Sequence, residues 1–269
     1  MYSEDLAQKA ADNLKAIREK KPLIHNITNY VVMNTTANAL LACGASPVMA
    51  HAAEEVEEMV SFAGALVLNI GTLTPPWIDS MIRAGKRANE LNVPIVLDPV
   101  GSGATALRTE SAKRIIDELN VTVVRGNASE VLSLAHEGSR TKGVDSIHSV
   151  DEASDAAVVL ANELNTTLVI TGEVDLVTDG IRIHLIYNGD PLMGYVTGTG
   201  CMATTMIGAF MAVDQDAVNG ASTALAYYGL AGERAASKAE GPGTFQAMLF
   251  DALYGLDEKA VKEGAKIRT

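Results

Sequence analysis

Hydrophobic positions along this chain follow two patterns that alternate. Short continuous apolar runs, typical of strands buried on both faces, are separated by segments in which apolar residues return every three or four positions, as on one face of a helix. The continuous runs are 65–70, 94–97, 121–124 and 167–170. Two further short segments, 23–28 and 46–49, which mix apolar and polar residues, come before them. We predict a strand at each of these six places.

The periodic segments predict helices between the strands and after them. Ser3, Asn29 and Thr109 are expected to cap three of these helices, because side-chain oxygens of these types accept from the first free N–H groups. The predicted helical ranges are 3–20, 30–43, 56–64, 75–85, 109–119, 151–164, 202–213, 215–236 and 242–256, with a further short helix after residue 127. A hairpin is expected over 175–187 with its turn at Asp179-Gly180. Residues 135–150 are polar and aperiodic, and a surface loop is expected there.

Strands that alternate with helices build βαβ units, which predict an α/β fold with a mostly parallel sheet and helices on both faces. No linker or repeat interrupts the pattern, so we expect a single domain over 1–269. Ligands of such folds bind beyond the carboxyl ends of the strands. The residues that follow the strands are therefore expected along one rim: Thr28, Asn29, Met49, Gly71, Thr72, Asp98, Arg125, Gly126, Asn127, Thr171 and Gly172.

The charge balance narrows the classes of partner. The chain has 21 basic and 33 acidic residues and a formal net charge of −12, which disfavours nucleic acid and anionic membrane surfaces. Its two cysteines are far apart in sequence and suggest neither a disulfide framework nor a zinc site. The charged N-terminal segment does not have the pattern of a signal peptide, and no apolar run is long enough to span a bilayer. We expect a soluble cytoplasmic protein.

A glycine-rich turn before the helix at 202–213 is the first candidate for chemistry. Gly198-Thr199-Gly200-Cys201 places backbone N–H groups without helical partners at a helix start, where they can hold a phosphate or a developing anion. The same field is expected to lower the pKa of Cys201 and favour its thiolate, a proton acceptor for a hydroxyl. Two plainer interpretations remain open: a tight turn that caps a buried helix, and a cysteine that merely fills space.

Charged residues on the predicted rim are the second candidate. Asp98 and Glu130 could hold Mg²⁺, which takes one or two protein carboxylates together with waters and substrate phosphates. The alternatives are that Asp98 is a turn residue and that Glu130 complements a helix dipole. Arg125 is either a phosphate clamp or an exposed strand terminator, and Thr171 either contacts a nucleotide or caps its strand. Met49 is either a core filler or part of an apolar pocket for a small heteroaromatic ring.

Seven motifs follow one another along the chain: His25-Asn26-Ile27-Thr28-Asn29, Gly44-Ala45-Ser46-Pro47-Val48-Met49, Asn69-Ile70-Gly71-Thr72, Asp98-Pro99-Val100-Gly101, Arg125-Gly126-Asn127-Ala128-Ser129-Glu130, Thr171-Gly172 and Gly198-Thr199-Gly200-Cys201. In this order the chain, from about Leu23 to Phe250, resembles the hydroxyethylthiazole kinase family, ribokinase-like enzymes of thiamine salvage. The resemblance covers most of the chain, and the seven motifs together are far more specific than any one of them.

The resemblance implies a ribokinase-like three-layer sandwich that phosphorylates 4-methyl-5-(2-hydroxyethyl)thiazole with Mg-ATP. It further implies a homotrimer with sites at subunit boundaries. Cys201 would occupy the place of the aspartate base of broader ribokinase-like enzymes, which leaves open whether any side chain takes the proton. The implied roles are metal carboxylates for Asp98 and Glu130, ATP contacts for Arg125 and Thr171, thiazole contacts for Met49 and Gly198, and neighbouring positions for Asn29 and Val31.

Three rivals stay open at this point. The first is a kinase for another small alcohol, such as hydroxymethylpyrimidine or pyridoxal. The second is an ATP-dependent dehydratase of hydrated nicotinamide nucleotides on a related scaffold. The third is a nucleotide-binding module without turnover, which the polar residues after successive strands disfavour.

Overall fold

The computed structural model describes residues 1–135 and 150–269 and places its strands in one nine-stranded sheet. The strand order is β2-β1-β3-β4-β5-β6-β7-β8-β9, parallel from β2 to β6 and antiparallel from β6 onwards. The strands are β1 (Leu23–Ile27), β2 (Ser46–Val48), β3 (Ala65–Asn69), β4 (Ile95–Asp98), β5 (Val123–Asn127), β6 (Thr167–Thr171), β7 (Asp175–Thr178), β8 (Ile183–Ile186) and β9 (Ile267–Arg268). The mostly parallel sheet predicted from the alternating pattern is confirmed.

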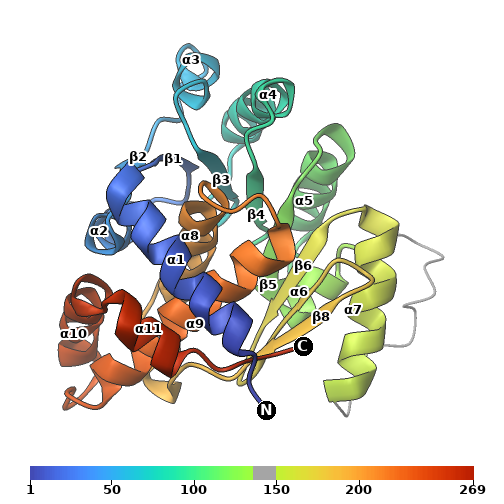
Figure 1. Ribbon diagram of the computed structural model, residues 1–269. Coiled ribbons are helices and arrows are strands. Elements are labelled where there is room, and N and C mark those ends of the chain that lie inside the picture. The colour runs from blue at the N-terminus through green and yellow to red at the C-terminus, as the bar shows by residue number, and fades with distance from the viewer. Residues whose placement is uncertain (136–149) are drawn as a thin grey trace.

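Helices pack on both faces of this sheet (Figure 1). Successive residues of a strand point to opposite faces, so Ala65 and Val67 join one core whereas Leu66 and Leu68 join the other. The first core includes α1 (Glu4–Lys20), α2 (Met33–Cys43), α8 (Thr199–Met211), α9 (Ala217–Ala236), α10 (Pro242–Gly255) and α11 (Glu258–Gly264). The second includes α3 (Val56–Val60), α4 (Pro75–Leu91), α5 (Ala106–Glu118), α6 (Ala128–Leu132) and α7 (Val150–Leu164).

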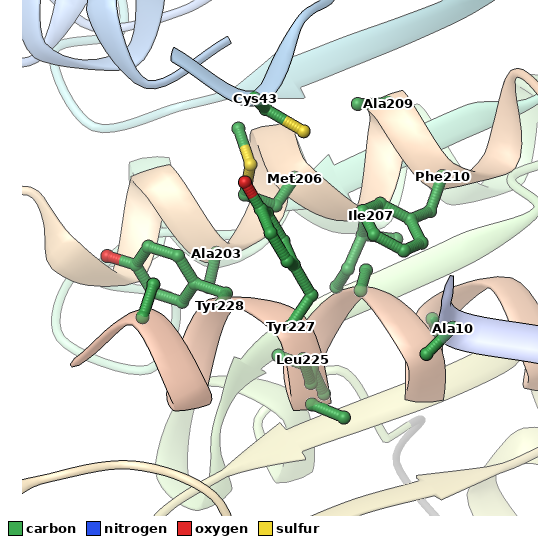
Figure 2. Close-up of a cluster of buried hydrophobic side chains, with 14 of the residues drawn as sticks. Ala10, Cys43, Ala203, Met206, Ile207, Ala209, Phe210, Leu225, Tyr227 and Tyr228 are labelled. Carbon is green, nitrogen blue, oxygen red and sulfur yellow. The ribbon is translucent and has the colours of Figure 1, made fainter. Parts of the chain in front are cut away.

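Helix α8 is the most enclosed element of the first core, since all of its residues from Met202 to Met211 are buried. Figure 2 shows Tyr227 extending from α9 past α8 towards Cys43. The hydroxyl of Tyr227 donates to the carbonyl of Leu253 at 2.6 Å, and its neighbour Tyr228 donates to the carbonyl of Thr199 at 2.9 Å. The buried side chain of Tyr228 therefore fixes the position of the first residue of α8.

Several predicted boundaries are wrong for local reasons. Helix α2 begins at Met33 rather than at residue 30, and its N-cap is Val32, because the side chain of Asn29 is bonded elsewhere. Thr105, and not Thr109, caps α5. The predicted turn at 125–127 belongs to β5, because pairing with β6 continues to the pair Asn127–Thr171.

Other differences concern short elements. The helix predicted over 56–64 is limited to α3, and the pattern did not predict the 3-10 helix η2 (Pro191–Tyr195), α11 or β9. The predicted hairpin is confirmed, with Gly180 at a φ of +88° in its turn. The predicted loop at 135–150 lies mostly outside the described residues. Over the described ranges 1–135 and 150–269, the helices are too short or too polar to cross a membrane.

Candidate active site

The polar rim predicted from the sequence exists as a geometric feature. Asn69 and Asp98 are paired at the carboxyl ends of β3 and β4, and Asn127 and Thr171 are paired at the ends of β5 and β6. Because parallel strands end on the same side of the sheet, these four residues share one edge. The start of α8 meets this edge, so side chains from distant parts of the chain converge there.

Asp98 is the buried centre of this edge, with a relative exposure of 1%. Its Oδ2 accepts from the Thr204 hydroxyl at 2.7 Å and from Asn69 Nδ2 at 3.0 Å. Arg125 Nη1 lies 3.7 Å from the same oxygen. Burial raises the pKa of Asp98 above its ordinary value of 3.8, opposed by Arg125 and Thr204. Its Oδ1 is buried and has no hydrogen-bond partner among residues 1–135 and 150–269.

Arg125 joins Asp98 to the start of α8 and to the end of β6. Its Nη2 donates to Thr171 Oγ1 at 2.6 Å, and its guanidinium lies against the backbone of Gly200. A Cβ on Gly200 would stand 2.8 Å from Nη1, so glycine lets this side chain approach the backbone closely and any other residue would require the guanidinium to shift. The buried cation is therefore held at a fixed place where three elements meet.

The thiol of Cys201 lies next to two amides. Asn69 Nδ2 is 3.2 Å and Asn29 Nδ2 is 3.7 Å from Sγ, and Asn29 also donates to Asn69 Oδ1 at 2.8 Å. Asn29 Oδ1 accepts from the backbone N–H of Val31 at 3.1 Å. This network connects the loop after β1 to the helix start.

The expected thiolate at Cys201 is wrong. Burial, followed by the charge of Asp98, raises the pKa of the thiol from 9.0 to about 11. The expectation rested on the field of the helix start alone, which lowers a thiol pKa. Cys201 is therefore a neutral thiol at physiological pH and a poor proton acceptor.

We expect the Cys201 thiol of the folded protein to react with iodoacetamide at pH 8 about tenfold more slowly than that of the unfolded chain. The thiolate fraction falls by roughly 100-fold, and the greater nucleophilicity of the more basic thiolate recovers about a factor of ten. Mass spectrometry of the peptide that contains Cys201, in buffer and in urea, measures both rates. A folded-state rate equal to or above the unfolded one would contradict the raised pKa.

The N-terminus of α8 has free backbone donors. Its first helical bond runs from the N–H of Met202 to the carbonyl of Gly198 at 2.8 Å, and neither Gly200 nor Cys201 has a backbone acceptor within the described chain. Gly198 has a φ of +93°, a left-handed conformation that favours glycine. The Thr199 hydroxyl donates away from the edge, to the carbonyl of Met193 at 2.8 Å. The Thr199 hydroxyl is thus already used within the chain, and the residue contributes to the site through its backbone alone.

A cavity of about 900 Å³ opens beside Arg125 and the start of α8. Its lining includes Arg125, Thr171 and Gly172, together with residues of the segment from Tyr187 to Gly194 and of α9. The cavity is large enough for a nucleotide. Asp175 also lines it, and burial raises the pKa of this carboxyl to about 6.

Glu130 lies on the same rim and is bonded to the backbone. Its Oε1 accepts from the N–H of Gly101 at 2.8 Å, and its Oε2 accepts from the N–H of Asn127 at 3.0 Å, forming a capping box with Asn127. Its charge contributes to raising the pKa of Asp98, so the two carboxylates influence each other. These contacts agree with the interpretation of Glu130 as a helix-start residue and leave lone pairs on both oxygens.

The carboxylates fit one mode of Mg²⁺ binding. No group of three or more His, Cys, Asp or Glu suited to a metal occurs in the described ranges, so a cage made by protein side chains alone is not present there. Mg²⁺ is commonly held by one or two carboxylates together with substrate phosphates. Asp98, with its unpartnered Oδ1, and Glu130 match that donor set.

The remaining predicted residues are not among those that line the cavity. Met49 directly follows β2 and is partly exposed, and Val31 is 65% exposed in the loop after β1. A Cβ on Gly198 would lie 2.9 Å from Val32 Cγ1, so the helix start packs closely on the β1 loop. Gly198, Asn29 and Val31 thus lie close to one another, whereas Met49 follows β2, the strand that pairs with β1.

Sequence reasoning gave no role to Asn69, Thr204, Asp175 or Tyr228. Asn69 bonds to Asp98, Asn29 and Cys201, and was quoted only as part of a motif. An amide at the end of an otherwise apolar strand, and a threonine within an apolar helix, are signals that could have identified Asn69 and Thr204.

Comparisons with known proteins agree on one family. The model of the hydroxyethylthiazole kinase family matches residues 14–259. A hydroxyethylthiazole kinase from Desulfotalea psychrophila is 62% identical, over 96% of this chain and 95% of the relative. The solved hydroxyethylthiazole kinase structure from Pyrococcus horikoshii has a TM-score of 0.89 and 48% identity, covering 97% of this chain and 98% of that one.

A more distant structure extends the likeness of the fold. A ribokinase-like superfamily protein from Enterococcus faecalis has a TM-score of 0.65 at 13% identity, covering 95% of each chain. At this identity the likeness concerns the fold alone. Together with the observed layers, it confirms the predicted ribokinase-like α/β architecture.

Proposed function

This chain belongs to the hydroxyethylthiazole kinase family, and we propose on that premise that it transfers the γ-phosphoryl group of ATP to the hydroxyl of 4-methyl-5-(2-hydroxyethyl)thiazole. The observation that carries the proposal is the place of Arg125. This buried cation lines the nucleotide-sized cavity, bonds to Thr171 and lies 3.7 Å from Asp98, beneath the free donors of α8. It thus links the cavity to the polar network around Cys201.

The nucleotide side of the reaction is assigned to the cavity. We infer that Arg125 and Thr171 contact the phosphates, and that the N–H groups of Gly200 and Cys201 stabilise the transferring phosphoryl group. Catalysis of phosphoryl transfer depends on positioning and on stabilising the charge of the equatorial oxygens. Donors fixed before the reaction supply that stabilisation without reorganisation.

We assign Mg²⁺ to Asp98 and Glu130. When bound, the ion neutralises charge on the phosphate oxygens. Asp98 is suited to this role because its Oδ2 is fixed by Thr204 and Asn69 while Oδ1 is without a partner among the described residues. Glu130 is held by two backbone N–H groups, which orient its carboxylate towards the loop after β4.

The acceptor alcohol is assigned to the other side of the α8 start. We propose that the alcohol contacts Asn29, Val31, Gly198 and Met49 there, since the soft side chain of Met49 suits a thiazole ring. Since Cys201 is a neutral thiol at physiological pH, we propose that the γ-phosphoryl group itself receives the proton of the hydroxyl. Cys201, together with the amides of Asn29 and Asn69, then orients the hydroxyl without deprotonating it.

The experiment that tests this function is incubation of the purified protein with Mg-ATP and the hydroxyethylthiazole, followed by mass spectrometry of the product. A phosphorylated thiazole is expected. Parallel reactions with hydroxymethylpyrimidine and pyridoxal test the rival kinases, and a reaction with a hydrated nicotinamide nucleotide tests the dehydratase. ATP hydrolysis without a phosphorylated alcohol, or no turnover at all, would contradict the proposal.

We also propose a domain organisation, an oligomeric state, a location and a class of excluded partners for this kinase. The single nine-stranded sheet supports the prediction of one kinase domain over 1–269. We propose a homotrimer, as implied by the family resemblance, and note that Tyr30, Val31 and Tyr195 beside the acceptor side are largely exposed apolar side chains. A cytoplasmic location and the absence of nucleic-acid partners agree with the acidic composition.

A further inference from the structure

Three aromatic rings meet at the acceptor side of the rim. Trp77, in the first turn of α4, is 6% exposed and stacks on His51 with ring centroids 4.5 Å apart and planes at 17°. Tyr30 meets the same indole edge-on, with centroids 4.6 Å apart and planes at 84°. We term these three residues the ring cluster. Tyr30 comes from the loop after β1, His51 from the loop after β2 and Trp77 from α4.

The ring cluster connects the loops that carry the assigned acceptor residues. Tyr30 stands between Asn29 and Val31, and its backbone N–H donates to Thr72 Oγ1 at 3.1 Å in the loop that leads to α4. His51 follows Met49 by two positions in the loop after β2. Both acceptor loops are therefore in contact with one indole.

Two ring contacts link Trp77 to these loops. The indole Nε1 is buried and has no acceptor within 1–135 and 150–269, so no hydrogen bond there fixes the ring in its plane. By contrast, the base of the β2 loop is fixed, because His25 Nε2 donates to the carbonyl of Ala50 at 2.7 Å. A ring held by stacking can adjust together with Tyr30 and His51.

We propose that Trp77 is a positioning residue for the acceptor alcohol, which holds the loops after β1 and β2 at their working separation and responds when the alcohol binds between them. The proposal rests on the proposed function, because the alcohol defines which loops matter. Offset and edge-to-face ring pairs add binding energy beyond the area they bury, so loss of both pairs has a measurable effect. Trp77 is not among the residues that line the nucleotide-sized cavity, so we expect ATP binding to be independent of it.

The test compares Trp77→Leu, Trp77→Phe and the control Ile82→Ala, which removes packing from the same helix and core without being part of the ring cluster. Trp77→Leu is expected to raise KM for the thiazole alcohol about tenfold and to change KM for ATP less than twofold. Trp77→Phe restores much of the loss, because a ring is retained. Ile82→Ala lowers the unfolding temperature and leaves both KM values near those of the wild type.

A spectroscopic measurement applies to the unmodified protein, because Trp77 is its only tryptophan. Addition of the thiazole alcohol without ATP is expected to change the fluorescence of the wild-type protein, and addition of a non-hydrolysable ATP analogue alone is expected to leave it unchanged. An alcohol titration without a change in emission overturns the inference, as does an equal effect of Trp77→Leu on both KM values.

The outcomes separate this inference from the proposed function. If the wild-type protein phosphorylates the thiazole and Trp77→Leu keeps a wild-type KM for the alcohol, the inference is wrong and the proposed function stands. If the wild-type protein forms no phosphorylated thiazole, both are wrong.

Discussion

Replacing Asp98 by Asn is expected to lower kcat by about 10²–10³ while the protein stays folded. Asparagine keeps the shape of the side chain and can still accept from Thr204 and Asn69, so the hydrogen bonds of Oδ2 have a substitute. What is lost is the negative charge opposite Arg125 and the start of α8. Steady-state kinetics at saturating substrates and a circular dichroism spectrum measure the two effects.

The pH profile gives this prediction a second readout. Burial raises the pKa of Asp98 above 3.8 in the protein without ligands, so the wild-type kcat/KM for ATP, which reports the free enzyme, should fall as the pH is lowered through a value higher than that of an ordinary carboxyl. The residual activity of Asp98→Asn should lack that fall. Asp214→Asn is the matched control, because Asp214 is a buried carboxylate beyond the other end of α8, bonded to Asn13 and Lys9. A wild-type kcat for Asp98→Asn would remove this carboxylate from the site.

Gly200→Ala is expected to lower the kcat/KM for ATP while the protein stays folded. The added Cβ would stand 2.8 Å from Arg125 Nη1 and 3.1 Å from Nη2, so the guanidinium must move away from Thr171 and Asp98. A displacement of about 1 Å at a reacting centre costs about 10²-fold, and we expect that loss in kcat/KM for ATP. Alanine is favoured over glycine in a helix by about 1 kcal/mol, which offsets part of the cost of displacing the buried guanidinium, so the variant should stay folded.

The control for this variant is Gly243→Ala. Gly243 is the second residue of α10, as Gly200 is of α8, and a Cβ there meets no atom within 4 Å. It should gain the same helix propensity without a kinetic effect. Urea unfolding and ATP kinetics on both variants give the comparison. If Gly200→Ala retained the wild-type kcat/KM for ATP, Arg125 would not be acting where the structure places it.

The layers and the rim could be predicted from sequence because their causes are local. A buried strand is recognisable from its own residues, and parallel strands bring their ends to one edge whatever their side chains. This reasoning placed Asp98 and Thr171 correctly at strand ends, whereas Arg125 lies within β5 and reaches the same edge through its guanidinium. Their chemical roles required the family resemblance, because a carboxylate after a strand is equally consistent with a turn.

Features that depend on distant neighbours were not predictable in this way. Asn29 has the pattern of a helix cap, yet its amide bonds to Asn69, forty positions away in the sequence. The pKa of Cys201 is raised and not lowered as expected, because burial and the charge of Asp98 act on the thiol. The two-residue strand β9 exists only through its pairing with β8.

The central claim is that a phosphoryl group passes between the start of α8 and Asp98. A crystal structure of the protein with Mg²⁺, ADP, aluminium fluoride and the thiazole alcohol tests it most directly, since the fluoride complex imitates the transferring group. The account predicts fluorine atoms within hydrogen-bond distance of the N–H groups of Gly200 and Cys201, with Asp98 on the facing side. A fluoride complex bound elsewhere, with those N–H groups directed at solvent, would contradict it.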